Sequence, residues 1–185
     1  MRYGGKRFPS WIGDPLFSKM EVLKLEKCKN CISLPKLGSL GSLKDLTIKG
    51  MMNLRTIGSE IYGDGCSTPF QSLEILHLEN LPEWECWETT RITENEHVGM
   101  FPHLHELFIV RCPKLSRKWP ELLPSLETLI VSKCPELLVS VSNFSMLCRL
   151  EIDECKGLVC GSTPIEPNLI KCMIHFTARI QKLYQ

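Results

Sequence analysis

The chain has 185 residues, of which 43% are hydrophobic and 23% are charged, a balance typical of a folded globular protein that buries a core. Its 22 lysine and arginine residues nearly balance its 21 aspartate and glutamate residues, so no net charge draws it to nucleic acid or to an anionic membrane. The sequence opens without the apolar segment of a secretory signal and has no apolar run near the roughly 18 residues that span a bilayer. We therefore expect a cytoplasmic or nuclear protein with no membrane span and no nucleic-acid partner.

The first 19 residues have no strand pattern of their own. The stretch Phe8-Pro9-Ser10-Trp11-Ile12-Gly13 leads directly into a periodic segment that begins at Met20. We interpret residues 1–19 as a partial repeat whose strand is missing, which predicts that the chain is a fragment or a truncated product.

From residue 20 onward, an apolar pattern of the form L-x-x-L-x-L recurs along the chain. Its starts are 21 to 31 residues apart, which indicates a unit of about 22 residues with two insertions, in the range of leucine-rich repeats. The copies are Met20-Leu23-Leu25, Leu43-Leu46-Ile48, Leu73-Leu76-Leu78, Leu104-Leu107-Ile109, Leu126-Leu129-Val131, Leu147-Leu150-Ile152 and a weaker Leu169-Cys172-Ile174.

The similarity between units continues past each strand. Three residues later stands the position that is asparagine or cysteine in leucine-rich repeats, occupied here by Cys28, Met51, Leu81, Cys112, Cys134 and Cys155. We predict a repeat domain over residues 20–180, with about six full repeats and a degenerate seventh, followed by a tail at 181–185.

This repeat predicts an α/β solenoid in the shape of a horseshoe arc. Each pattern forms a short strand whose first, fourth and sixth side chains point inward, and the stacked strands form a parallel sheet on the concave face. The convex side is expected to be mostly irregular or short helical. The two insertions, within residues 55–72 and 85–103, are predicted to be surface loops.

Several residues have the spacing of chemically active groups. Cys28 and Cys31 could be half of a zinc site or a redox pair, but both fall on apolar repeat positions, so we interpret them as small buried hydrophobes. His103 and His105 lack a third ligand at a suitable spacing, and His105 is expected to face solvent. We therefore predict no metal, no cofactor, no small-molecule substrate and no catalysis.

Two further expectations concern residues of the repeat. Cys112, Cys134 and Cys155 share one position in consecutive units and should form a buried row of free thiols. Trp84 falls on an apolar repeat position and should belong to the core, whereas Trp87 is the freer of the two indoles.

The outward strand positions predict a binding face. An apolar cluster of Phe108, Val110 and Ile130 interrupts an otherwise polar row, and such patches mark interaction sites. The alternative is that the second insertion folds back and covers the cluster. The complete set of predicted partner-binding residues is His77, Glu79, Glu106, Phe108, Val110, Arg111, Ile130 and Lys133.

Blocks over roughly residues 2–160 have a more specific resemblance. They include Phe8-Pro9-Ser10-Trp11-Ile12-Gly13-Asp14-Pro15, Cys28-Lys29-Asn30-Cys31, Leu34-Pro35-Lys36-Leu37-Gly38, Ile57-Gly58-Ser59-Glu60-Ile61-Tyr62-Gly63, Pro69-Phe70-Gln71-Ser72-Leu73-Glu74 and Glu83-Trp84-Glu85-Cys86-Trp87. With these blocks the sequence resembles the leucine-rich-repeat region of plant intracellular disease-resistance proteins of the coiled-coil, nucleotide-binding, RPP13-like type.

The resemblance implies a function. In that family the repeats hold a nucleotide-binding switch inactive and help to select the pathogen effector or modified host protein that releases it. This chain has no phosphate-binding G-x-x-x-x-G-K-[ST] loop, so nucleotide binding is not implied. The alternatives are a substrate-binding repeat domain of a ubiquitin-ligase adaptor, the ectodomain of a receptor kinase, and an enzyme. The ectodomain is disfavoured because its N-x-L-x-G-x-I-P signature is absent.

Overall fold

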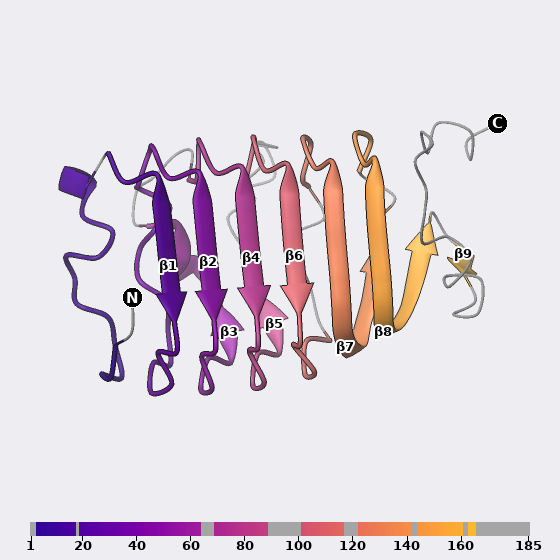
Figure 1. The fold of residues 1–185 in the computed structure, drawn as a ribbon, viewed down its shortest axis with the longest axis horizontal. Helices are drawn as coiled ribbons and strands as arrows, with labels where there is room; N and C mark the ends of the chain where they lie inside the picture. The colour runs from indigo at the N-terminus through magenta and orange to yellow at the C-terminus, as the bar shows by residue number, and fades with distance from the viewer. Residues whose placement is uncertain are drawn as a thin grey trace.

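The repeated strands form one sheet in which neighbours in the chain are neighbours in space. The computed structural model describes residues 3–17, 19–63, 69–88, 101–116, 122–141, 144–160 and 163–165. The sheet contains β1 (Val22–Glu26), β2 (Asp45–Lys49), β4 (Ile75–Glu79), β6 (Glu106–Val110), β7 (Thr128–Ser140), β8 (Arg149–Cys160) and β9 (Thr163–Ile165), in this order (Figure 1). Pairing is parallel from β1 to β8 and antiparallel between β8 and β9. The predicted parallel sheet is therefore confirmed, and the seventh predicted strand pattern lies outside the described residues.

The register of the sheet follows the repeat. The fourth position of each pattern pairs with the fourth position of the next, so Leu46 lies between Leu23 and Leu76, and Leu107 pairs with Leu129. Buried and partly buried residues alternate along β2, β4 and β6, because successive side chains of a strand point to opposite faces. The inward side chains form one continuous core from repeat to repeat, which agrees with the predicted alternation.

A left-handed residue recurs in six repeats, directly after β1, β2, β4 and β6 and within β7 and β8. Positive φ angles between 49° and 68° recur at the same repeat position, and only Gly50 adopts this conformation without a steric cost. The backbone N–H of this residue donates to the carbonyl of the residue just before the left-handed residue of the next repeat, for example Gly50 to Glu79 and Arg111 to Ser132. The other left-handed residues are Lys27, Asn80, Arg111, Lys133 and Glu154.

Free cysteines occupy the position after this turn in four of the six repeats, and Met51 and Leu81 occupy it in the other two. The Cys112 thiol donates to the Val110 carbonyl at 3.5 Å, and the Cys134 thiol donates to the Ser132 carbonyl at 3.4 Å. The Cys134 and Cys155 thiols also reach carbonyls of the preceding repeat, at 3.8 and 3.7 Å. The predicted row of free thiols is confirmed, although Cys155 is only half-buried.

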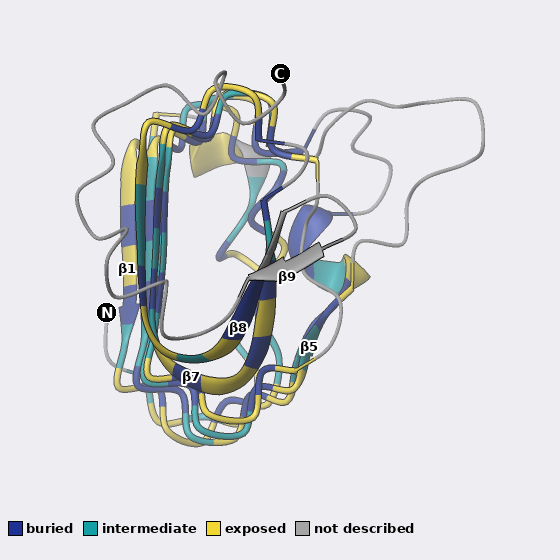
Figure 2. Ribbon diagram, turned by 90° about the vertical axis from the view of Figure 1, so that its right-hand side faces the viewer, coloured by how far each residue is buried: buried dark blue, intermediate teal, exposed yellow. Residues whose placement is uncertain are grey.

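The side of the molecule that lies across the core from the first halves of the strands is called here the opposite wall. It contains more β-structure than predicted. Figure 2 shows β7 and β8 bending so that their second halves run along this wall, on the same side of the molecule as β5. Two short strands, β3 (Thr56–Ile57) and β5 (Cys86–Trp87), pair in parallel, and the helical elements are the 3-10 turns η1 (Pro15–Phe17) and η2 (Ser59–Tyr62). The expectation of a mostly irregular or helical side is therefore wrong for these segments.

The described flanks of the two insertions belong to the core, which corrects their prediction as surface loops. Tyr62, Phe70, Trp87 and Phe101 are almost fully buried, and their rings contact one another with centroids 5.0 to 6.1 Å apart. Trp87 is 1% exposed, so its assignment as the freer indole is also wrong. An apolar cluster of this size offsets the entropy of ordering both segments. Trp84 is buried as predicted.

Residues 3–17 pack against the loop that follows β1 and contain no strand. The Ile32 N–H donates to the Lys6 carbonyl, and the Ser39 hydroxyl donates to the Gly13 carbonyl at 2.9 Å. Among the described residues, no helix reaches the length and apolar character that crossing a bilayer requires. The limits predicted for the partial repeat, the repeat domain and the tail stay predictions.

Candidate protein-binding face

Three neighbouring strands bring the predicted binding residues together. The register places His77, Phe108 and Ile130 in one row across β4, β6 and β7. Val110 lies beside Glu79 in the next row. All five side chains are half-buried and belong to the face of the sheet opposite the core. The structure therefore places residues at equivalent repeat positions next to one another on the sheet.

The apolar part of this face is larger than predicted. The Phe108 ring packs against His77 with ring centroids 5.2 Å apart, so the aromatic surface extends onto β4. Ile75 is also half-buried at the start of β4, where it pairs with Glu106. Ile75 was not predicted, because the apolar cluster was defined by the fifth and seventh residues of each repeat pattern. Ile75 is the third residue of its pattern, and its apolar side chain is the feature that could have revealed it. The apolar strip thus consists of Ile75, Phe108, Val110 and Ile130.

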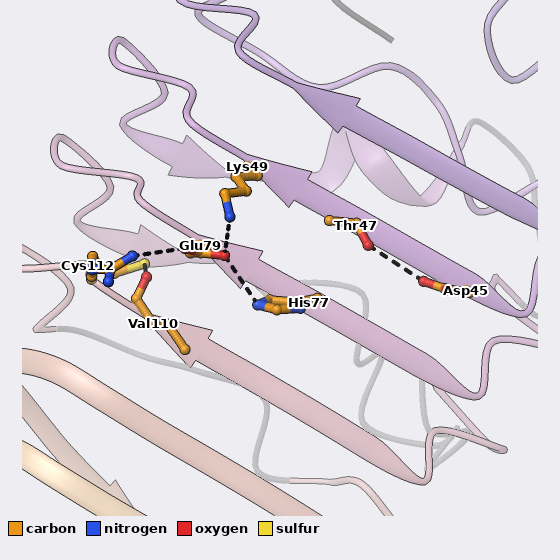
Figure 3. Close-up of polar contacts among 8 residues, drawn as sticks. Asp45, Thr47, Lys49, His77, Glu79, Val110 and Cys112 are labelled. Carbon is orange, nitrogen blue, oxygen red and sulfur yellow. Dashed lines mark hydrogen bonds and ion pairs between the residues drawn. The ribbon is translucent and has the colours of Figure 1, made fainter.

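Glu79 is the centre of an ion-pair cluster. Its carboxylate lies 2.7 Å from Lys49 Nζ, 2.9 Å from Arg111 Nη1 and 3.6 Å from His77 Nε2, and Figure 3 shows Lys49 and His77 approaching it from two strands. The Glu79 side chain is only 12% exposed, so its contacts are less screened than those of a free surface pair. Glu79 is therefore paired with neighbouring charged groups, whereas the sequence predicted it to be one of the free charges around the apolar cluster. Lys49, which the prediction omitted, stands at the same repeat position one unit earlier.

The other charged residues of the predicted rim are more accessible. Arg111 and Lys133 are exposed and in the left-handed conformation; Arg111 follows β6 directly, whereas Lys133 lies within β7. Lys133 Nζ lies 3.9 Å from a Glu154 carboxylate oxygen, a long contact between two exposed groups that contributes little. Glu106 is half-buried at the start of β6, and no ion pair joins it to another described residue.

The described part of the second insertion lies away from this face. The Glu85 N–H donates to the Arg55 carbonyl, and the Glu88 N–H donates to the Ile57 carbonyl, so residues 85–88 pair with the first insertion on the opposite wall. Residues 89–100, on which the predicted alternative of a covering segment depends, lie outside the described residues.

The chemically active residue types have structural roles where they are described. Burial and the nearby Cys28 raise the pKa of the Cys31 thiol from 9.0 to about 11, and this thiol donates to the Gly5 carbonyl at 3.1 Å. A protonated, hydrogen-bonded thiol is a poor nucleophile and a poor metal ligand. His103 and His105 are exposed, as predicted for His105. Within the described ranges, no group of three acidic, histidine or cysteine side chains could hold a metal ion.

Comparisons with known proteins agree with the repeat. The family model described as R13L1/DRL21 LRRs matches residues 1–51. Disease resistance RPP13-like protein 1 of Arabidopsis thaliana is 45% identical over 139 residues, which cover 72% of this chain and 13% of the relative. A second disease resistance protein of Arabidopsis thaliana is 40% identical over 75% of this chain and 10% of the relative. Disease resistance protein RGA4 of Solanum bulbocastanum is 31% identical over 60% of this chain and 11% of the relative. No solved structure matches the chain.

Proposed function

Because the chain belongs to the leucine-rich-repeat region of RPP13-like disease-resistance proteins, we propose that it is a non-catalytic recognition module of an intracellular plant immune receptor. Its sheet face binds a pathogen effector or a modified host protein. In the absence of that ligand, the same module contacts the nucleotide-binding switch of the receptor and holds it inactive. The chain spans 13% of the length of the first relative.

The observation that supports this proposal is the apolar strip on three adjacent strands. Phe108, Val110 and Ile130 lie on the face of the sheet that the core does not use. Neighbouring strands are about 4.8 Å apart, so the strip forms a continuous surface of aromatic and branched side chains. Clustered apolar side chains surrounded by charge are typical anchors of protein interfaces. We place this strip on the concave side of a gently curved solenoid.

In each repeat, different residues contribute to stability and to recognition. The inward side chains of each strand are buried, whereas the outward residues of the same strand pack only against neighbours on their own face. Outward residues can therefore change with the ligand while the core stays the same, which suits a receptor that must follow a varying target.

The proposal is tested by binding of the chain to the nucleotide-binding region of the receptor that contains it. We expect Phe108→Ala and Ile130→Ala each to weaken the complex, with Phe108→Ala raising Kd by about 30-fold, or about 2 kcal/mol. Leu138→Ala is the matched control, because Leu138 is 47% exposed in the second half of β7, past the bend. Isothermal titration calorimetry measures each Kd, and circular dichroism melts verify folding. Equal affinities of the Phe108 and Leu138 variants would count against the proposed face.

A further inference from the structure

The outward face of β4, β6 and β7 is electrically polarised along the strand direction. Acidic residues gather where the three strands begin, and basic residues gather beside and just past the row of Glu79, Val110 and Ser132, where β4 and β6 end and β7 continues. The first group, called here the acidic end, consists of Glu74, Glu106 and Glu127. The second group, called here the basic end, consists of Lys49 at the end of the neighbouring strand β2, Arg111 directly after β6 and Lys133 within β7, around the paired Glu79. The apolar strip lies between the two.

No ion pair joins the acidic end to another described residue. Glu74 and Glu127 are exposed and immediately precede β4 and β7, while Glu106 is the first residue of β6. The nearest basic candidates in the repeat are occupied elsewhere, because Lys44 pairs with Glu21 at 3.5 Å and Arg149 pairs with Glu151 at 2.6 Å. Three carboxylates at successive repeats therefore create a negative potential at this end.

The basic end keeps an excess of positive charge. Glu79 neutralises one of its two close cations, Lys49 and Arg111, and leaves the other in excess. Lys133 adds a further charge, which Glu154 offsets only in part at 3.9 Å. Asp153 and Glu154, which lie within β8, bound this basic region on the next repeat.

We propose that the partner presents a segment that lies along the strands, with its basic side chains over the acidic end and its acidic side chains over the basic end. An apolar side chain between them packs on Phe108 and Ile130. Five strand residues at about 3.3 Å each span roughly 16 Å, so an extended segment of five to seven residues covers the face. Complementary charges at both ends determine the orientation, because the reversed segment would place like charges together.

This inference rests on the proposed function and adds the chemistry of the partner segment and its orientation. A suitable probe is the blocked peptide Lys-Lys-Leu-Trp-Leu-Glu-Glu with a nitroxide spin label on its acidic end. We expect the label to broaden the amide signals of Asn80, Arg111 and Lys133 several-fold more than those of His105 and Glu127 in the full chain. Raising the salt concentration to 1 M, where the Debye length is about 3 Å, should remove this preference.

A charge-reversed chain supplies the matched control. It combines Glu74→Lys and Glu127→Lys with Arg111→Glu and Lys133→Glu, all at exposed positions. Because Arg111→Glu replaces an ion-pair partner of Glu79 by a like charge, a circular dichroism melt verifies that this chain is folded. The same peptide should then bind in the opposite orientation, so that its label broadens the amide signals at the starts of the strands. A peptide of equal composition with alternating charges should show no preference in either chain.

The outcomes separate the two proposals. Equal broadening at both ends of the strands, or no broadening with the peptide at millimolar concentration, would overturn the inferred polarity, while the calorimetric test of Phe108 still decides the proposed function. Broadening confined to residues outside the sheet face would contradict both.

Discussion

The Trp87 indole donates a hydrogen bond of 2.9 Å from Nε1 to the hydroxyl oxygen of Tyr62. The two residues lie 25 positions apart, one at the end of η2 in the first insertion and the other in β5 at the start of the second. The Tyr62 hydroxyl in turn donates to the Glu88 carbonyl at 3.3 Å, and burial raises the pKa of Tyr62 despite the Trp87 bond. The two insertions are therefore joined inside the core by one satisfied polar chain.

Removal of this hydroxyl should destabilise the fold. Tyr62→Phe leaves the buried Trp87 N–H without its acceptor, which costs about 1–3 kcal/mol. Urea unfolding curves of Tyr62→Phe, Trp87→Phe and the double variant measure the coupling between the two residues. We expect the double variant to lose less stability than the two single losses combined, because both remove the same bond. Strictly additive losses would show that the two side chains act independently.

The inward and outward strand positions should differ sharply in their contribution to stability. Leu107→Ala or Leu129→Ala removes a side chain with 0% exposure and should lower the free energy of unfolding by roughly 2–5 kcal/mol. Thr128→Ala, at the half-buried outward position next to Leu129, should be near neutral. Denaturant melts of the three variants test this contrast. Equally mild effects would mean that the leucines do not hold neighbouring repeats together.

Gly38 should tolerate no side chain, because a Cβ there would overlap with the backbone carbonyl of Tyr62. Its N–H donates to the Ile61 carbonyl at 2.8 Å, so it fixes the first insertion against the repeat that begins at Met20. We expect Gly38→Ala to cost about 1–3 kcal/mol in thermal or urea unfolding. Gly41→Ala is the matched control, since nothing lies within 4 Å of a Cβ at that position. Similar stability of the two variants would contradict this close approach.

The buried thiols should be unreactive and should make the fold sensitive to alkali. Hydrogen bonding with Cys112, together with burial, raises the pKa of Cys134 from 9.0 to about 12, and that of Cys31 rises to about 11. Iodoacetamide at about pH 8, followed by peptide mass spectrometry, should modify the exposed Cys148 well before either of these residues. Equal labelling rates would contradict the burial of the thiols.

The same pKa values predict how stability depends on pH. A raised thiol pKa means that the folded state holds its proton more tightly than the unfolded chain does, so this contribution is complete below pH 9. It is lost as the pH rises from about 9 through 11 to 12. The free energy of unfolding should therefore fall in this window, and a Cys31→Ala/Cys134→Ala variant, although less stable at neutral pH, should show a shallower slope. An unchanged slope would assign the alkaline loss to other groups.

The periodic part of this protein could be predicted from the sequence. A strand alternates its side chains with a period of two, and parallel stacking repeats each offset in the next unit, so Leu107 had to pair with Leu129 and Phe108 with Ile130. Burial of the Cys134 thiol followed from the same offsets. The apolar strip on β6 and β7 could be recognised for this reason.

Only the tertiary structure decided what happens outside the period. The burial of Trp87 against Tyr62 and the pairing of β3 with β5 join segments from different repeats. The period places Lys49 beside Glu79, but only the structure shows the ion pairs of Glu79 with Lys49 and Arg111. Such contacts depend on the path of each chain segment after its strand. An insertion has no equivalent in the other repeats, so its path cannot be predicted from them. Their stability comes from burial and charge pairing that exist only once the neighbouring repeats are in place.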